Sequence, residues 1–167
     1  MTRFIAVAVL TLFCLTVFAG TPDEVGKTNA GFEKLKSLVG TWKGTSSDGE
    51  VTLTYKLVSG GTTLMETNDS EMHKDGMITM YHLDGNTLMM THYCSMGNQP
   101  RMKAAALTND GKLAFSFIAG TNMTKNDAHM HALTITFKDN DHMKQEWTMR
   151  TAGKDEMHVP FEMTRIH

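Results

Sequence analysis

MITMYHLDGNTLMMTHYC, residues 77–94, is the stretch that decides the fold. Two largely apolar runs, Met77–His82 and Thr87–Cys94, flank Asp84-Gly85. An Asp-Gly pair between two such runs is among the strongest short-range signals of a β-hairpin. The stretch therefore predicts two antiparallel strands joined by a tight turn.

The rest of the chain repeats short strands and turns. Glu50–Val58 alternates between apolar and polar residues, and Gly60-Gly61 separates it from the next run. Including the hairpin, strands are predicted from about residue 42 and over residues 50–58, 62–68, 77–82, 87–94, 100–107, 112–118, 130–137, 142–150 and 158–165. Turn signals about every 8–12 residues are typical of an antiparallel sandwich or barrel. The absence of alternating helices and strands argues against a parallel sheet.

The predicted fold is all-β: an antiparallel up-and-down β-barrel of about ten strands, because the strands follow one another through short turns. One short helix is expected before the first strand. Phe32, Leu35 and Leu38 stand at helical spacing, Asn29 can cap the helix, and Gly40 ends it. The helix would plug one open end of the barrel, and a barrel of this size can hold a small ligand.

The chain begins with features of a secretory signal peptide. Arg3 precedes the apolar run Phe4–Phe18, and Ala19-Gly20 offers a cleavage site. The run is shorter than the roughly 20 residues that span a bilayer, so stable membrane insertion after cleavage is not expected. We predict a signal peptide over residues 1–19, a flexible lead-in over 20–28 and a single barrel domain over 29–167. The protein is expected to be exported from a bacterial cell to the periplasm or beyond.

The formal net charge of −2 and the lack of a basic block argue against a nucleic-acid partner. A small hydrophobic molecule is the expected partner, and the oligomeric state stays open. No nucleophile elbow, phosphate-binding loop or dinucleotide fingerprint occurs in the sequence. No catalytic residue is therefore assigned; the sequence does not decide whether the protein is an enzyme, but it favours a non-enzymatic role.

Cys94 would be the only cysteine of the mature protein, since Cys14 lies in the signal peptide. It is either a packed core residue, a reactive thiol or one half of an intermolecular disulfide. His92 and Cys94 share one face of their strand with Leu88 and Met90. If that face is interior, the two side chains line the cavity about 7 Å apart. Both faces of the strand are rather apolar, so the sequence leaves the inward face open.

The candidate ligand-binding residues follow from this barrel. His92, Cys94, Arg101 and His131 would provide polar contacts; His131 shares a face with the apolar positions 133, 135 and 137. The residues expected to line the cavity are Trp42, Met90 and Trp147. The competing interpretations are ordinary structural roles: hydrogen-bonded core histidines, a rim arginine paired with an acid such as Glu66 or Glu146, and tryptophans that fill the core.

Methionine is the unusual feature of the composition, with 15 in the chain, several of them beside a histidine. Thioether and imidazole groups suit soft metals such as Cu(I). Because neighbours on a strand point to opposite faces, His129 and His131 can share an ion while Met130 cannot join them. A soft-metal (copper) or redox protein is therefore one alternative function, and a structural domain without a ligand is another.

Two sets of motifs resemble known proteins. Gly40-Thr41-Trp42 after a short helix is similar to the opening of lipocalin-like (calycin) barrels. Thr-His-Tyr-Cys (residues 91–94) and Gly-Asn-Gln-Pro-Arg-Met (residues 97–102) resemble a family of exported bacterial proteins of unknown function. The resemblance implies a β-barrel over roughly residues 32–166.

Calycins bind apolar ligands, and their nitrobindin-like branch holds haem through a histidine near the C-terminus. His158 and His167 are the late histidines of this chain. The resemblance thus makes haem a possible cofactor beside copper, and neither is established.

Overall fold

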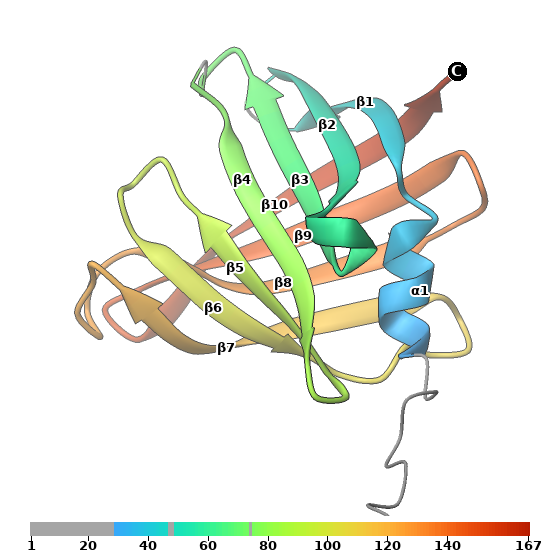
Figure 1. Cartoon of the computed structure of the whole chain (residues 1–167). Coiled ribbons are helices and arrows are strands. Elements are labelled where there is room, and N and C mark those ends of the chain that lie inside the picture. The colour runs from blue at the N-terminus through green and yellow to red at the C-terminus, as the bar shows by residue number, and fades with distance from the viewer. Residues whose placement is uncertain (1–28, 47–48, 74) are drawn as a thin grey trace, which may run out of the picture.

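The computed structural model describes residues 29–46, 49–73 and 75–167. The predicted signal peptide and lead-in, residues 1–28, lie outside the described residues. Within the described ranges, ten antiparallel strands close into one barrel (Figure 1). Each strand pairs with its neighbours in the chain, and β1 pairs with β10 to close the barrel. The predicted up-and-down barrel with one short helix is confirmed.

The elements lie close to their predicted positions. The helix is α1 (Ala30–Lys36), and one 3-10 turn, η1 (Ser59–Gly61), joins β2 to β3. The strands are β1 (Gly40–Ser46), β2 (Gly49–Val58), β3 (Thr63–Ser70), β4 (Met77–Asp84), β5 (Thr87–Tyr93), β6 (Gln99–Ala104), β7 (Lys112–Thr121), β8 (His129–Phe137), β9 (His142–Thr151) and β10 (Lys154–Ile166).

The β4–β5 hairpin forms as its sequence predicts. Asp84 pairs with Thr87, which leaves Gly85 and Asn86 as a two-residue loop. Gly85 has a φ of 56°, a left-handed conformation that glycine adopts at no steric cost. This register places Leu88, Met90 and His92 in the barrel interior, where all three are buried. The inward face of β5, open from sequence, is therefore decided by the fold.

Helix α1 covers one end of the barrel. The Asn29 side chain accepts a hydrogen bond from the backbone N–H of Phe32 at 3.0 Å and so caps the helix. Phe32 and Leu35 are buried within the same core as the inward residues of the strands. The predicted cap and the predicted plug are both present.

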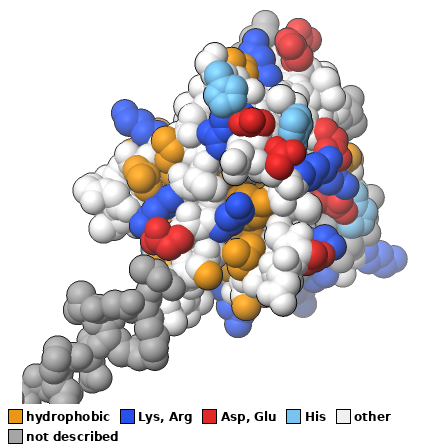
Figure 2. All heavy atoms as spheres, turned by 90° about the vertical axis from the view of Figure 1, so that its right-hand side faces the viewer, with side chains coloured by type: hydrophobic (Ala, Val, Ile, Leu, Met, Phe, Trp, Pro, Cys, Tyr) orange, Lys and Arg blue, Asp and Glu red, His pale blue; other side chains and the backbone are white. Residues whose placement is uncertain are grey.

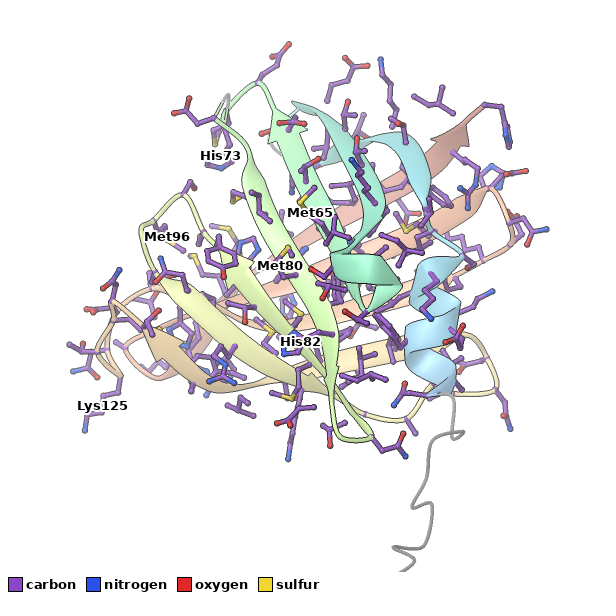
Figure 3. The ribbon with its side chains drawn as sticks, viewed as in Figure 1. Met65, His73, Met80, His82, Met96 and Lys125 are labelled. Carbon is purple, nitrogen blue, oxygen red and sulfur yellow. The ribbon has the colours of Figure 1, made fainter. Side chains whose placement is uncertain are left out.

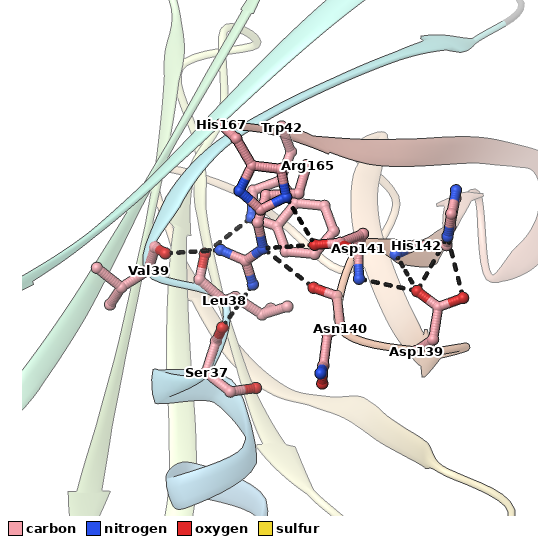
Figure 4. Close-up of polar contacts among 10 residues, drawn as sticks. All are labelled: Ser37, Leu38, Val39, Trp42, Asp139, Asn140, Asp141, His142, Arg165 and His167. Carbon is pink, nitrogen blue, oxygen red and sulfur yellow. Dashed lines mark hydrogen bonds and ion pairs between the residues drawn. The ribbon is translucent and has the colours of Figure 1, made fainter.

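Arg165, near the end of β10, holds this closed end together (Figure 4). Its Nη1 donates to the carbonyl of Val39 at 2.8 Å, and its Nη2 donates to the carbonyl of Ser37 at 2.7 Å. Its Nε donates to the carbonyl of Asn140 in the β8–β9 turn at 3.0 Å. The guanidinium also lies 4.2 Å from the centroid of the Trp42 ring. One side chain thus connects the helix end, the β8–β9 turn and the closing strand.

The surface beside α1 carries charges of both signs. Figure 2 shows lysine, arginine, aspartate, glutamate and histidine side chains interspersed with small hydrophobic areas on this face. No helix in the described part of the chain is long and apolar enough to cross a bilayer.

Arg165→Ala should lower the free energy of unfolding by about 2–4 kcal/mol, because three backbone carbonyls lose a charged donor and Trp42 loses its cation. Urea unfolding followed by tryptophan fluorescence measures this change. Arg101→Ala is the matched control: Arg101 is exposed on β6, and its loss should stay within about 0.5 kcal/mol. Equal effects of the two substitutions would contradict the role assigned to Arg165.

Candidate functional site

The end of the barrel opposite α1 is hollow. A pocket of about 280 Å³ lies there, between the ends of the strands. Figure 3 shows His73 and Met96 at this end, beside the β3–β4 and β5–β6 connections. The described lining residues are Ser46, Val51, Asn68, Ser70, Met72, His73, Met77, Cys94, Ser95, Met96, Met130, Met149, Met157, Val159 and Phe161. We call this the mouth pocket.

Thioethers dominate the wall of the mouth pocket. Six of its fifteen described lining residues are methionines, and Val51, Val159 and Phe161 add further apolar surface. No lysine, arginine, aspartate or glutamate occurs among these lining residues. The described wall is therefore apolar, flexible and free of fixed charge, which suits an uncharged apolar molecule.

The floor of the mouth pocket carries one polar atom in need of a partner. Asn68 and Met77 stand opposite each other on β3 and β4, and both side chains point inward. The Oδ1 atom of Asn68 is buried and accepts no hydrogen bond from any described residue. A buried amide oxygen left unpaired costs about 1–3 kcal/mol. A ligand that brings an O–H or N–H group to this atom would recover that energy.

Cys94 lies beside this floor, just after β5. Its backbone N–H donates to the carbonyl of Asn98 at 3.1 Å, and its own carbonyl accepts from the N–H of Gly97 at 2.9 Å. These bonds form the tight turn into β6. Burial raises the pKa of the Cys94 thiol above its ordinary value. The thiol is therefore neutral at pH 7, whereas a reactive cysteine needs a lowered pKa.

A buried polar row crosses the barrel one layer below the floor. Tyr55 pairs with Glu66, Glu66 with Thr79, and Thr79 with His92, on four adjacent strands. The Oε2 atom of Glu66 accepts from the Tyr81 hydroxyl at 2.9 Å and from the Gln145 amide at 2.8 Å. Burial raises the pKa of Glu66 although these donors favour its charged form.

The same network reaches the aromatic core. The Gln145 amide also donates to the Tyr55 hydroxyl at 2.6 Å, and its oxygen accepts from Trp147 Nε1 at 2.9 Å. Side chains held by these hydrogen bonds thus fill the middle of the barrel. Open space is found in the layer above them, at the mouth.

His92 ends the polar row and is held neutral. Its ring lies 4.8 Å from that of Trp147, and its Nδ1 shares a hydrogen bond of 2.9 Å with the Thr79 hydroxyl. Burial lowers the pKa of His92 to about 4. Its Nε2 is buried and has no partner within the described part of the chain. With Cys94 neutral as well, the pair lacks the imidazolium–thiolate chemistry of cysteine nucleophiles.

The structure brings together only part of the predicted site. Cys94 lines the mouth pocket, and His92 and Trp147 lie in the packed layer beneath it. Met90 and Trp42 are fully buried in the core and do not line the pocket.

Arg101 and His131 lie outside the barrel wall. Arg101 is exposed and pairs with Thr91, whose side chain points outward from β5. A register shift between Met130 and Ala132 breaks the simple alternation of β8, so Met130 lines the mouth pocket and His131 faces outward. The expectation that Arg101 and His131 contact an interior ligand is therefore not met.

His129 and His131 do meet, as their spacing suggested. His129 Nε2 lies 3.1 Å from His131 Nδ1, and His129 Nδ1 lies 2.7 Å from the carbonyl of Asp127. The Phe117 ring packs against both imidazoles. Across the described ranges, no group of three or more His, Cys, Asp or Glu side chains is placed to hold a metal ion. The pair is thus an aromatic cluster on the outer wall, without a third ligand of these types.

The late histidines do not reach the mouth pocket. His158 is exposed on β10, and His167 is bound to Asp141 at the closed end, at 3.1 Å. His73 is the only histidine among the described lining residues. The chain therefore lacks, at this pocket, a histidine near the C-terminus that would hold haem as the resemblance implies.

Sequence reasoning missed most of the pocket. Asn68 was hidden because its strand reads Leu-Met-Glu-Thr-Asn over residues 64–68, in which inward and outward positions are equally polar. The usable signal was methionine beside histidine. Met72, His73, Met130 and Met157 all come from such pairs, and all four line the pocket.

Comparisons with known proteins support the fold and give no activity. No family model and no curated relative matches the sequence. A protein of unknown function from the DUF3598 family of Nostoc punctiforme is similar in structure, with a TM-score of 0.56 and 13% identity over 79% of this chain and 48% of that one. The present chain therefore spans about half the length of that protein.

A second similar structure is that of Rv2717c from M. tuberculosis. The TM-score is 0.53 with 16% identity, and the match covers 83% of this chain and 98% of the other. At such identities the likeness concerns the fold alone. It is a barrel fold shared with proteins whose names give no activity, so the function has to be argued from the pocket.

Because buried His92 is neutral, we expect the free energy of unfolding to fall as the pH falls. In the unfolded chain a histidine has a pKa near 6.5, so the unfolded state binds the extra proton first as pH falls. Above about pH 6.5 neutral His92 makes its full contribution to the free energy of unfolding. That contribution falls by about 3 kcal/mol in total between pH 6.5 and about pH 4.

Urea unfolding between pH 7 and pH 4 measures this loss, and His92→Gln should flatten the slope whatever its effect at pH 7. An imidazole NMR titration of His92 with a midpoint above pH 6 would contradict the assignment.

Proposed function

We propose that this protein binds a small, mostly apolar, uncharged molecule in the mouth pocket of its barrel. The observation that carries the proposal is the pocket itself: a hollow of about 280 Å³ with an apolar, methionine-rich wall. Its volume is close to the lower end of the usual range for ligand sites, about 300–1,000 Å³. It is roughly twice the volume of a cavity known to hold benzene, about 150 Å³.

The polar groups of the pocket narrow the ligand class. A carboxylate or phosphate would find no lysine or arginine among the described lining residues, and an ammonium would find no acid there. Asn68 Oδ1 instead requires a hydrogen-bond donor. The ligand we infer is a neutral molecule with an apolar body and one hydroxyl, arylamine or amide N–H directed at Asn68.

The methionine wall also bears on specificity. Met side chains are unbranched and polarizable, so they adapt to ligands of different outline. A pocket built from Met77, Met130 and Met149 therefore favours a class of apolar molecules over a single rigid compound. The packed polar layer below it sets the depth that any ligand can reach.

The place of action is part of this proposal. The apolar run Phe4–Phe18 followed by Ala19-Gly20 supports export, and a barrel that carries an apolar molecule through an aqueous compartment would have a role there. We infer a lipocalin-like carrier or scavenger in the periplasm or outside the cell. Native mass spectrometry of the protein purified from its own host would identify the natural occupant.

Binding of the neutral fluorophore N-phenyl-1-naphthylamine tests the pocket. It is apolar and carries one N–H, and its fluorescence rises in an apolar site. Met149→Trp should weaken its binding at least about tenfold, because the larger ring fills the space that the probe needs.

Met80→Trp is the matched control, since Met80 points away from the interior on β4 and should leave the affinity unchanged. Circular dichroism checks that both variants fold. If the wild type does not bind the probe, or if Met149→Trp binds it as tightly as the wild type, the pocket is not the site.

Cys94 reports on occupancy without a spectroscopic probe. Its neutral, buried thiol should react with iodoacetamide more slowly than free cysteine at pH 7.5, because the thiolate is the reacting form. A saturating amount of the naphthylamine should slow the alkylation further, at least about threefold, because the bound probe would fill the pocket that the Cys94 side chain lines. Mass spectrometry follows the alkylation. An unchanged rate with bound probe would place the probe elsewhere.

A further inference from the structure

A second group of soft ligands lies on the outer wall of the barrel. Met65 on β3 stands directly opposite Met80 on β4, and His82 on β4 stands directly opposite Met89 on β5. Their neighbours along each strand are the inward residues of the core, so all four side chains point outward. Figure 3 shows Met65, Met80 and His82 following one another along the face of β3 and β4. We call these four residues the outer-wall cluster.

The spacing of the cluster permits one shared ion. Side chains directly opposite each other in an antiparallel pair have Cβ atoms about 4.5–5.5 Å apart, and diagonal neighbours lie within about 7–8 Å. Met80 and Met89 are diagonal neighbours, because Met80 pairs with Thr91, two residues beyond Met89. Met80, His82 and Met89 are mutual neighbours by this measure, so two thioethers and the imidazole can turn toward a common point about 2–2.5 Å from each donor atom. Met65 lies about 12 Å from Met89, two strand spacings and two residues away, and flanks this point.

The burial of the cluster suits a metal site more than a solvated surface. Met89 is 5% exposed although it points away from the core, and the other three side chains are partly buried. A thioether loses little hydration when it is covered, and a neutral imidazole loses less than a charged group. The cluster and the ion can thus form a largely dehydrated site at a small cost in desolvation free energy.

We propose that the outer-wall cluster binds Cu(I) through the sulfur atoms of Met80 and Met89 and one imidazole nitrogen of His82. Thioether and imidazole are the donors that soft Cu(I) selects, whereas divalent hard cations need carboxylate or carbonyl oxygen. The ligand set is neutral, so the loaded site carries a single positive charge.

The surrounding charges disfavour a divalent ion more than a monovalent one. Lys56 stands opposite Met65, and Lys103 stands opposite Met89. Arg101 lies in the next position on the same outer face of β6. These cations repel a bound dication twice as strongly as a monocation at the same distance. The position therefore discriminates against Zn²⁺ and Cu²⁺ and leaves Cu(I), or its mimic Ag(I), as the ion that fits.

The mouth pocket also brings thioethers together, since Met149 stands directly opposite both Met130 and Met157. The experiment therefore compares variants of the two places. The His129–His131 pair provides only two imidazoles, and both nitrogens of His129 already lie within hydrogen-bond distance of a partner. On the outer wall an imidazole and two thioethers stand together on the adjacent strands β4 and β5.

Anaerobic titration with Cu(I) against the chromophoric chelator bicinchoninate tests the proposal on the folded chain. The wild type should take one equivalent. Met80→Leu and His82→Gln should each weaken binding at least about tenfold, because each removes a donor atom. Leucine is close to methionine in volume and His82 is partly exposed, so both variants should keep the fold. Two-dimensional NMR with Ag(I) should shift the amides of β4 and β5 first.

Met149→Leu and Cys94→Ala, both in the mouth pocket, are the matched controls and should bind Cu(I) as the wild type does. The proposal is overturned if the pocket variants lose the ion while Met80→Leu keeps it. It is also overturned if Zn²⁺ binds the cluster as tightly as Cu(I), or if the wild type competes for Cu(I) no better than Met80→Leu.

Discussion

The buried carboxyl group of Glu66 is the constraint on which the interior depends. A carboxyl group in the middle of a barrel has to find donors, and here Tyr81 and Gln145 supply them from strands far apart in the sequence. Gln145 in turn binds Tyr55 and Trp147, so one network links β2, β3, β4 and β9 across the interior. Removing one member would leave several polar groups unpaired at once, which is why such networks specify a single packing.

This network also divides the barrel into two unequal ends. Below it, α1 and the Arg165 contacts close the structure, and the core is filled by large side chains such as Trp42. Above it, the strand ends diverge around smaller and more flexible residues, and a hollow remains. The proposed ligand site is therefore shallow and lies at the mouth, in contrast to a barrel whose centre is empty. That geometry limits the occupant to a small molecule.

Opposite faces of the same strands support two different chemistries. On β4, Met77 faces the mouth pocket while Met80 and His82 face the outer wall. Inside, methionine provides an adaptable apolar surface; outside, the same side chain stands beside an imidazole and becomes a potential metal donor. The abundance of methionine is thus explained by two sites that the barrel wall separates. The pocket is the site proposed for an apolar ligand, and the outer-wall cluster is the place proposed for Cu(I).

Local signals in the sequence determine much of this architecture. The Asp84-Gly85 turn, the alternation in β2 and the cap at Asn29 each depend on neighbouring residues only, and each is found as expected. The pairing of β1 with β10 follows from a meander of this length, because its two edge strands are otherwise left unpaired.

The site required tertiary structure, because its residues meet across distances that no local pattern encodes. Asn68, Cys94, Met130 and Met157 are far apart in the sequence and come together only when the barrel closes. Arg101 and His131 show the opposite case: in sequence each was a candidate for contact with an interior ligand. Strand pairing placed Arg101 on the outer face, and a bulge in β8 turned His131 outward. The sequence by itself determined the strands and their order; the register and the closure of the sheet decided which side chains face one another, because a shift of one residue exchanges the two faces of a strand.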